Sequence, residues 1–348
     1  MTPSRGKRAP VISDVAACAG VSVSTVSRYL NGSNHLSPES ADKIARAIEL
    51  LGYRPNLVAR GLKRSSMRMI AVLSTNTTLL GSAVTIQGIE DEARAQDYSV
   101  MISKLDQSSP TEVQKVVDTV VALNPSGVIV LKYDATAEKA LQMLPAEVPT
   151  VVIGGAPEDE RDQVSLCERE GGQAMTEYLL SLGHDTVHHI GVPVRSQGTS
   201  RTDGWEAALH TRGLHRPEPL SCGWEPSGAR LLGRELASRS DITAVFVGND
   251  ELAMGLIRGL REAGRPVPET MSVVGFDDHP LSDIWEPALT TYRQDFMTAG
   301  RSAVELVVSR IKAHQEAEDL APRLREVPGE IVVRQSARSR LHDAGDPH

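Results

Sequence analysis

The spacing of apolar residues changes near residue 68 and divides the chain into two differently patterned parts. The first part predicts short helices over residues 13–19, 23–30 and 38–51. Gly20 is suited to end the first helix and Ser22 to cap the second, so only a tight turn separates them. Two helices joined in this way are typical of a helix-turn-helix unit.

From residue 68 onward, continuous apolar runs alternate with helical segments. The expected strands are 69–73, 99–102, 128–131, 149–153, 187–191, 244–247 and 272–275. The expected helices are 82–96, 111–123, 136–144, 171–182, 203–212, 227–238 and 250–263. Such alternation indicates α/β structure with parallel sheets covered on both faces, and a second series beginning near 170 predicts two doubly wound lobes. A ligand is then expected between the lobes, beyond the carboxyl ends of the strands.

The formal charge of −8 is unevenly distributed along the chain. Residues 1–66 contain ten Lys and Arg but only four Asp and Glu, a net charge of +6, so the remainder carries −14. A basic segment on an acidic body predicts that only the first part binds a polyanion. A basic arm that merely aids solubility would give the same charge pattern.

Several function classes lack their sequence signals. Neither GxGxxG nor GxxxxGK occurs, which argues against dinucleotide and P-loop sites, and no cofactor is expected. The cysteines Cys18, Cys167 and Cys222 are far apart and form no CxxC pair, as expected for thiols in a reducing cytosol. The basic N-terminus lacks the apolar region of a signal peptide, and no apolar run approaches the ~18 residues of a membrane span. We therefore expect a cytoplasmic protein without a membrane partner.

Short motifs in both parts carry a further signal. The first part contains ISDVA (12–16), AGVSVSTVSR (19–28), NG (31–32), LGYRPN (51–56) and ARGL (59–62). The second part contains LGH (182–184), RTDGW (201–205), GND (248–250), SVVGFDD (272–278), PALTT (287–291) and QD (294–295). In order and spacing, these motifs resemble those of LacI/GalR-family transcriptional regulators over nearly the whole chain.

This resemblance implies a domain organisation. Residues 1–55 would form a three-helix DNA-binding head, 56–66 a hinge helix, and 67–340 a two-lobed core resembling periplasmic binding proteins. The N-lobe would comprise about 67–164 and 296–328, and the C-lobe about 165–293 and 329–340. The tail, 341–348, lacks the leucine heptad of tetrameric relatives, so a homodimer is expected.

In such a head, the second helix lies in the major groove of DNA. The resemblance assigns sequence choice to Val23 and Ser24: valine can contact a thymine methyl group, and serine can donate or accept. Arg28 can form a forked contact to guanine. Further phosphate or base contacts are expected from Thr25, Ser27, Asn31 and His35. A small helical subdomain with solvated Ser and Arg side chains is the alternative.

In the linker, Asn56 can cap a helix of about two turns, which is too short to persist alone in water. The resemblance implies that Asn56, Ala59 and Leu62 contact DNA, with a leucine from each subunit wedged into a central base step of the minor groove. The alternative is a Leu62 packed against the head or core. Pairing of two heads implies a palindromic operator in double-stranded DNA.

In the core, Arg201, Asn249 and Asp277 match the family's ligand-binding positions, and their donors and acceptors suit a polyol. Trp224 lies where some sugar-responsive relatives place a stacking aromatic side chain, although a structural tryptophan fits the sequence as well. Thr75 and Gln294 are further candidates for effector binding.

The effector class is left open by these residues, because relatives use the equivalent Arg and Asp positions for purines too. The segment 75–82 departs from the family's usual Asn-Pro-aromatic sequence in a way that favours a galactoside or similar sugar. Residues 165–168 replace a common Val-Asp pair, which leaves the contact at that place open.

Two clusters resemble other kinds of site. His184, His188 and His189 look like metal ligands, but alternation along a strand would send neighbouring histidines to opposite faces. Asp277 and Asp278, with His279 and Asp283, could act in acid–base catalysis, yet one loop offers no opposed partner for them. We expect neither a metal site nor an enzyme.

The sequence as a whole predicts a repressor whose operator affinity is controlled by a small molecule, expected to be a sugar, bound between the lobes. A corepressor-dependent regulator or an activator of the same family is the alternative. A free sugar-binding protein shares the core but would need a signal peptide and no head. A sugar-metabolising enzyme would have to turn over its ligand.

Overall fold

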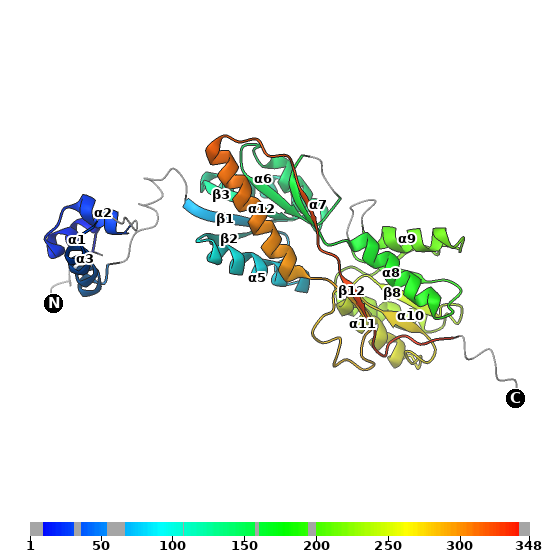
Figure 1. The fold of residues 1–348 in the computed structure, drawn as a ribbon. Helices are drawn as coiled ribbons and strands as arrows, with labels where there is room; N and C mark the ends of the chain where they lie inside the picture. The colour runs from blue at the N-terminus through cyan, green and yellow to red at the C-terminus, as the bar shows by residue number, and fades with distance from the viewer. Residues whose placement is uncertain are drawn as a thin grey trace, which may run out of the picture. The chain divides into compact units, whose positions relative to one another are not determined.

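The computed structural model describes residues 10–30, 36–53, 67–106, 108–156, 160–193 and 200–340. The chain divides into two compact units, residues 1–67 and 68–348, each of which is considered by itself (Figure 1).

The first unit contains α1 (Ile12–Ala19), α2 (Val23–Leu30) and α3 (Pro38–Leu51). Gly20 ends α1 in the left-handed region with a φ of 65°, a conformation that glycine adopts without a steric penalty. Ser37 caps α3 by accepting a hydrogen bond from the backbone of Ser40. Val15, Val26 and Ile44, one from each helix, are fully buried in a shared apolar core. The predicted helix-turn-helix head is confirmed.

The N-lobe of the second unit is built around a sheet in the order β11-β5-β4-β3-β1-β2. Its strands are β1 (Met67–Ser74), β2 (Ser99–Lys104), β3 (Pro125–Leu131), β4 (Thr150–Ile153), β5 (Asp162–Ser165) and β11 (Leu324–Glu326). Its helices are α5 (Leu80–Ala95), α6 (Pro110–Ala122), α7 (Ala135–Met143) and α12 (Phe296–Glu316). The pairs β1–β2, β3–β4, β4–β5 and β5–β11 are parallel, as the continuous apolar runs predict.

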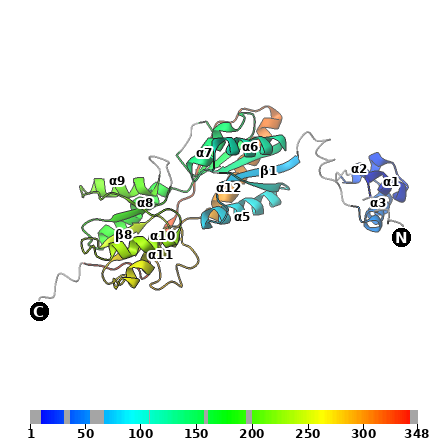
Figure 2. The same ribbon diagram turned by 180° about the vertical axis from the view of Figure 1, so that it is seen from behind.

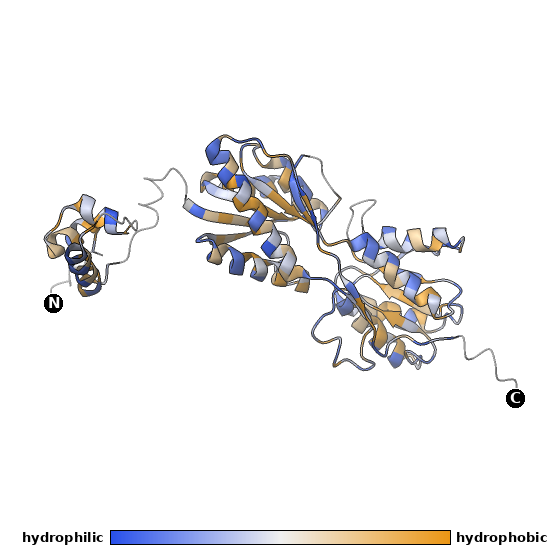
Figure 3. Ribbon diagram, viewed as in Figure 1, coloured by the Kyte–Doolittle hydropathy of each residue, from blue (hydrophilic) through white to orange (hydrophobic). Residues whose placement is uncertain are grey.

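Helices cover both faces of this sheet (Figure 2). One apolar core joins the sheet to α5 and α12, and a second joins it to α6 and α7. Strand β3, which is buried along its whole length, contributes Ile129 to the first core and Val130 to the second. Apolar residues therefore concentrate along the strands and the inward sides of the helices (Figure 3).

The C-lobe repeats this plan around a parallel sheet in the order β7-β6-β8-β9. Its strands are β6 (His188–Gly191), β7 (Leu220–Ser221), β8 (Ala244–Val247) and β9 (Ser272–Val274). Its helices are α8 (Glu168–Ser181), α9 (Arg201–Thr211), α10 (Pro226–Leu236) and α11 (Asp250–Glu262). One apolar core contains side chains of α10 and α11, and another contains side chains of α8 and α9. The predicted two-lobed fold is confirmed.

The C-terminal part of the chain returns to both lobes. Strand β10 (Thr291–Arg293) leads into α12 of the N-lobe, and β12 (Glu330–Val332) pairs antiparallel with β10 after β11 has joined the N-lobe sheet. In the N-lobe, the fully buried Asp162 forms ion pairs of 2.8 Å with Arg310 of α12 and with Arg323. Among the described residues, we find no helix with the length and apolar character needed to cross a bilayer.

Candidate functional site

Helix α2 exposes several of the side chains that the sequence analysis predicts to contact DNA. Val23 is 44% exposed at the first position of the helix, which is unusual for an apolar residue, and Ser24 and Arg28 are also exposed. Thr25 and Ser27 are half-buried, whereas Val26 turns into the core of the head. The helix thus presents an apolar group, hydroxyl groups and a guanidinium on its outer surface.

The start of α2 is fixed by its own hydroxyl groups. The Ser22 Oγ atom accepts a hydrogen bond from the backbone N–H of Thr25 and lies 2.8 Å from both Ser24 Oγ and Thr25 Oγ1. These contacts hold the two hydroxyl groups at the N-terminal end of the helix, where a recognition helix contacts base edges. The other predicted DNA contacts, Asn31, His35, Asn56, Ala59 and Leu62, lie outside the described residues.

In the core, a cavity is lined by residues of both lobes. Leu79, Tyr133 and Phe296 come from the N-lobe side. The C-lobe contributes Arg201, Trp224, Asn249 and Asp277, so the structure brings four of the predicted effector-binding residues together. Each lies at the carboxyl-terminal side of a strand, where ligands bind in doubly wound folds.

Arg201, the first residue of α9, is held from several sides. Its Nη2 atom lies 2.8 Å from Glu168 Oε1, 3.0 Å from Gln294 Oε1 and 2.9 Å from Asp277 Oδ1. Its Nη1 atom donates to the carbonyl oxygen of Gly248, and its guanidinium lies 4.1 Å from the centre of the Phe276 ring. A planar cation with this many contacts has little rotational freedom, which favours precise recognition of a ligand.

Asp277 is a largely buried carboxylate whose hydrogen-bonding capacity is only partly used. Burial raises its pKa to about 7, and the nearby Arg201 offsets only part of that effect. Although Oδ1 forms an ion pair with Arg201, it accepts no well-aligned hydrogen bond from any described residue. A buried acceptor without such a bond is costly, and ligand hydroxyl groups would remove that cost.

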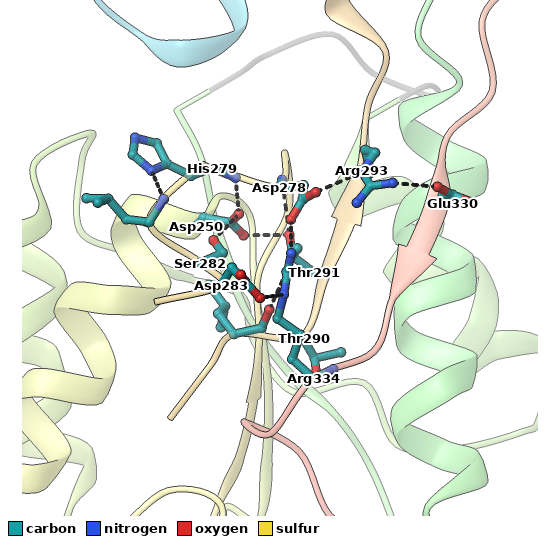
Figure 4. A network of polar contacts seen from close by, with 12 residues as sticks. Asp250, Asp278, His279, Ser282, Asp283, Thr290, Thr291, Arg293, Glu330 and Arg334 are labelled. Atoms are coloured by element: carbon teal, nitrogen blue, oxygen red, sulfur yellow. Dashed lines mark hydrogen bonds and ion pairs between the residues drawn. The ribbon is translucent and has the colours of Figure 1, made fainter. Parts of the chain in front are cut away.

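The loop that carries Asp277 is anchored by its neighbours (Figure 4). Asp278 forms ion pairs of 2.8 Å with both Arg293 and Arg334. Asp277 and Asp278 have φ angles of 104° and 54°, conformations that residues with side chains rarely adopt. The ion pairs of Asp278 therefore help to hold a strained loop in the conformation that places Asp277 at the cavity.

Asp250, the first residue of α11, supports the same loop. Its carboxylate accepts hydrogen bonds from the backbone of His279 and from the side chains of Ser282 and Thr291 (Figure 4). Burial raises its pKa to about 6 despite these donors. Its neighbour Asn249 caps α11 by accepting from the backbone of Leu252 at 2.8 Å, which leaves the amide nitrogen to donate to a ligand.

The comparisons with known proteins agree with this geometry. Residues 11–56 match the model of bacterial regulatory proteins of the lacI family, and residues 176–337 match that of a periplasmic binding protein-like domain. The HTH-type transcriptional repressor PurR of Haemophilus influenzae (strain PittEE) is 30% identical over 336 residues, which cover 95% of this chain and 99% of that protein. The PurR repressor of Pasteurella multocida (strain Pm70) is 31% identical over 337 residues, with the same coverage.

This chain belongs to the lacI family of bacterial regulatory proteins. The LacI-family chain is similar to solved structures as well. The Lac repressor dimer bound to operator and the anti-inducer ONPF matches with a TM-score of 0.86 and 25% identity, over 95% of this chain and 100% of that one. The complex of the transcriptional regulator CelR with cellobiose matches with a TM-score of 0.69 and 29% identity, over 94% and 100% of the two chains. The LacI-family chain is thus a DNA-binding transcriptional repressor with a ligand-binding core.

Two predicted effector-binding residues of this LacI-family repressor lie beside the cavity rather than on its wall. Gln294 is buried, and its side chain connects Arg201 to the carbonyl oxygen of Leu166. It therefore positions the guanidinium. Thr75 lines a neighbouring cavity and donates a hydrogen bond to Asp134.

Other residues that line the cavity were not predicted from the sequence. Glu168 pairs with Arg201, and it belongs to the segment 165–168 whose contact the sequence left open. Tyr133 lines the cavity two residues after the end of β3. The signal for Tyr133 was available, since residues that follow parallel strands meet at one edge of a sheet.

Two of the histidines near β6, His184 and His189, have hydrogen-bond partners within the C-lobe. Both ring nitrogens of His184 lie 3.0 Å from hydroxyl groups, those of Thr243 and Ser272. His189 contacts the carbonyl oxygen of Phe246 and the hydroxyl of Thr202, each at 2.9 Å. Burial lowers the pKa of each of these two histidines to about 4. Their ring nitrogens therefore serve the internal packing of the lobe.

Replacement of Asp277 by asparagine is expected to change the pH dependence of stability. The folded wild-type protein keeps a proton on Asp277 up to about pH 7, whereas the unfolded chain releases it near pH 4, so this group's contribution to stability falls as pH rises between the two values. Asparagine does not titrate there. We expect the Tm of Asp277→Asn relative to wild type to rise by a few degrees from pH 4.5 to pH 8, measured by thermal denaturation without ligand.

The matched control is Asp283→Asn, because Asp283 is a largely exposed carboxylate of the same segment. Its Tm relative to wild type should change little with pH. An equal, pH-independent shift in both variants would contradict the assignment of a buried titrating group to Asp277.

Proposed function

We propose that this LacI-family repressor binds a palindromic operator as a homodimer, and that a sugar bound between the core lobes controls its operator affinity. It would act in the cytoplasm, associated with the nucleoid. The observation that carries the proposal is the largely buried Arg201–Asp277 pair at a cavity lined by both lobes. A ligand held there contacts both lobes at once, and it can shift their arrangement only through its different affinity for the two states.

The chemistry of the cavity supports a hydroxylated ligand. Asp277 offers an acceptor, and Arg201 and Asn249 offer donors, which together match the mixed character of sugar hydroxyl groups. Trp224 supplies an aromatic surface for the apolar face of a sugar ring. The relative CelR is described in complex with cellobiose. Because other relatives are repressors named PurR, any test of the effector must also include purines.

For DNA, we propose that Val23, Ser24 and Arg28 contact base edges and that Thr25 and Ser27 fix the register of α2. Asn31, His35, Asn56, Ala59 and Leu62 are proposed as further contacts on the resemblance alone. Leu62 would wedge into the central base step, and unchanged operator affinity in Leu62→Ala would contradict this role.

We infer recognition rather than catalysis at the cavity. Asp278 is engaged by Arg293 and Arg334, and Asp250 by three hydrogen-bond donors, so these carboxylates have structural partners. We propose that effector binding lowers operator affinity and so releases the operator. The alternative is corepression, in which effector binding raises operator affinity.

The test is a mobility-shift assay of the full chain on the DNA upstream of its own gene, repeated with a panel of sugars and with purine bases. We expect at least one sugar to change operator affinity by tenfold or more, in the range of typical allosteric coupling. A response to a purine but to no sugar would contradict the proposed effector class and leave the repressor assignment intact.

A further inference from the structure

A second cavity adjoins the first on its N-lobe side. The two share Leu79, Ser82, Tyr133 and Trp224 as lining residues. The rest of the second cavity is formed by segments 75–78, 104–106 and 133–134, which lie at or just after the carboxyl ends of β1, β2 and β3. Because the shared residues lie between them, one elongated ligand can occupy both cavities.

The side chains around the second cavity are polar and already ordered. Asp134 accepts hydrogen bonds from the hydroxyl of Thr75 and from two backbone N–H groups at the start of α7. Asn76 Oδ1 accepts from both the backbone and the hydroxyl of Thr78. Pre-ordered polar groups lower the entropic cost of binding a ligand with many hydroxyl groups.

The charges around the second cavity favour a neutral ligand. Among the described residues that line it, two side chains are acidic, Asp106 and Asp134, and one is cationic, Lys104. A phosphate or carboxylate group would meet more negative than positive charge there. A second sugar ring would meet hydroxyl, amide and carboxylate groups instead.

Trp224 lies where the two cavities meet. Among the described residues that line the second cavity, it is the one that comes from the C-lobe, from the segment between β7 and α10. Its half-buried indole borders both cavities, so it can contact a ligand on each side of a linkage. An aromatic ring at such a junction suits the apolar faces of two joined sugar rings.

We propose that the effector is a disaccharide, with one ring at Arg201 and Asp277 and the second ring in the cavity formed by segments 75–78, 104–106 and 133–134. This rests on the proposed function, because it specifies the size of the sugar bound at the same site. The second ring contacts N-lobe residues, so the linkage between the rings makes one molecule span both lobes.

The test is isothermal titration calorimetry on the full chain with matched pairs of neutral sugars: galactose against lactose, and glucose against cellobiose and maltose. We expect at least one disaccharide to bind tenfold or more tightly than its monosaccharides. Thr77→Phe places a large side chain in the second cavity alone, because Thr77 does not line the first. This variant should lose the disaccharide's advantage and keep the monosaccharide's affinity.

The matched control is Thr111→Phe, an exposed position on α6 that lines neither cavity. It should bind both sugars as the wild type does. Equal affinity for monosaccharide and disaccharide, or an equal loss of both in Thr77→Phe, would overturn the second subsite while the sugar-controlled repressor stands. Absence of binding by every sugar would overturn the proposed effector class together with this inference.

Discussion

Asp277→Ala is expected to abolish the response at effector concentrations that suffice for the wild type and to leave operator affinity within about twofold of wild type. Hydrogen bonds to a charged group contribute about 1.5–3 kcal/mol each, so the loss of this carboxylate should weaken effector binding by about 100-fold. The variant also leaves the guanidinium of Arg201 with one carboxylate partner fewer. Fluorescence anisotropy on a labelled operator, titrated with effector, measures both quantities on one sample.

The control for this experiment is Asp283→Ala, which removes a mostly exposed carboxylate from the same segment. Its effector response should equal that of the wild type. If Asp277→Ala still responded at the wild-type effector concentration, Asp277 would not belong to the effector site. If it lost operator binding as well, the separation of the two functions would be wrong.

Arg28→Ala is expected to reduce discrimination between the operator and a scrambled duplex by about 10- to 100-fold. A forked contact from arginine to guanine contributes roughly 1–3 kcal/mol of discrimination, and Arg28 is exposed on α2, where it can reach a base edge. Binding to the scrambled duplex should fall much less, because there Arg28 supplies only charge. Competition binding with both duplexes at one fixed salt concentration measures the ratio.

Arg46→Ala is the matched control, because Arg46 is an exposed arginine of the same head but lies on α3. We expect it to weaken both duplexes alike and to preserve their ratio. If the two variants had the same effect, Arg28 would act through charge alone and α2 would not read sequence at this position.

Much of the fold could be predicted because local patterns agree with tertiary packing. Ser22, Gly20 and Gly52 mark helix ends by local chemistry, and the structure places α2 and α3 at the predicted bounds. Strand β8 was predicted at 244–247, where it lies, because its continuous apolar run is buried on both faces.

Other helices and strands could not be predicted from local sequence patterns. Strands β10 and β12 have three residues each, too few to show a period, and they are defined by pairing with each other across a long separation in sequence. The long helix α12 was not delimited by the pattern. Its Ala303 and Val307 are fully buried against a sheet whose strands lie far away in the sequence.

The main residues of the candidate site were predictable, but most of their contacts with one another were not. Arg201, Asn249, Asp277 and Gln294 lie in recognisable motifs, whereas the contacts of Arg201 with Glu168 across 33 residues and with Gln294 across 93 residues could not be predicted from those motifs. Pairings of this kind depend on the folded lobes. The supporting role of Asp250 has the same origin, since its donors come from His279, Ser282 and Thr291.

The central claim is that occupancy of the core cavity and binding of DNA by the head are energetically coupled. Such coupling is reciprocal, so the operator must change effector affinity by the same factor by which the effector changes operator affinity. The most direct measurement is the effector's Kd for the full chain, determined by calorimetry with and without saturating palindromic operator. We predict that the operator changes this Kd by tenfold or more, whereas a scrambled duplex does not; an identical Kd in all three conditions would contradict the account.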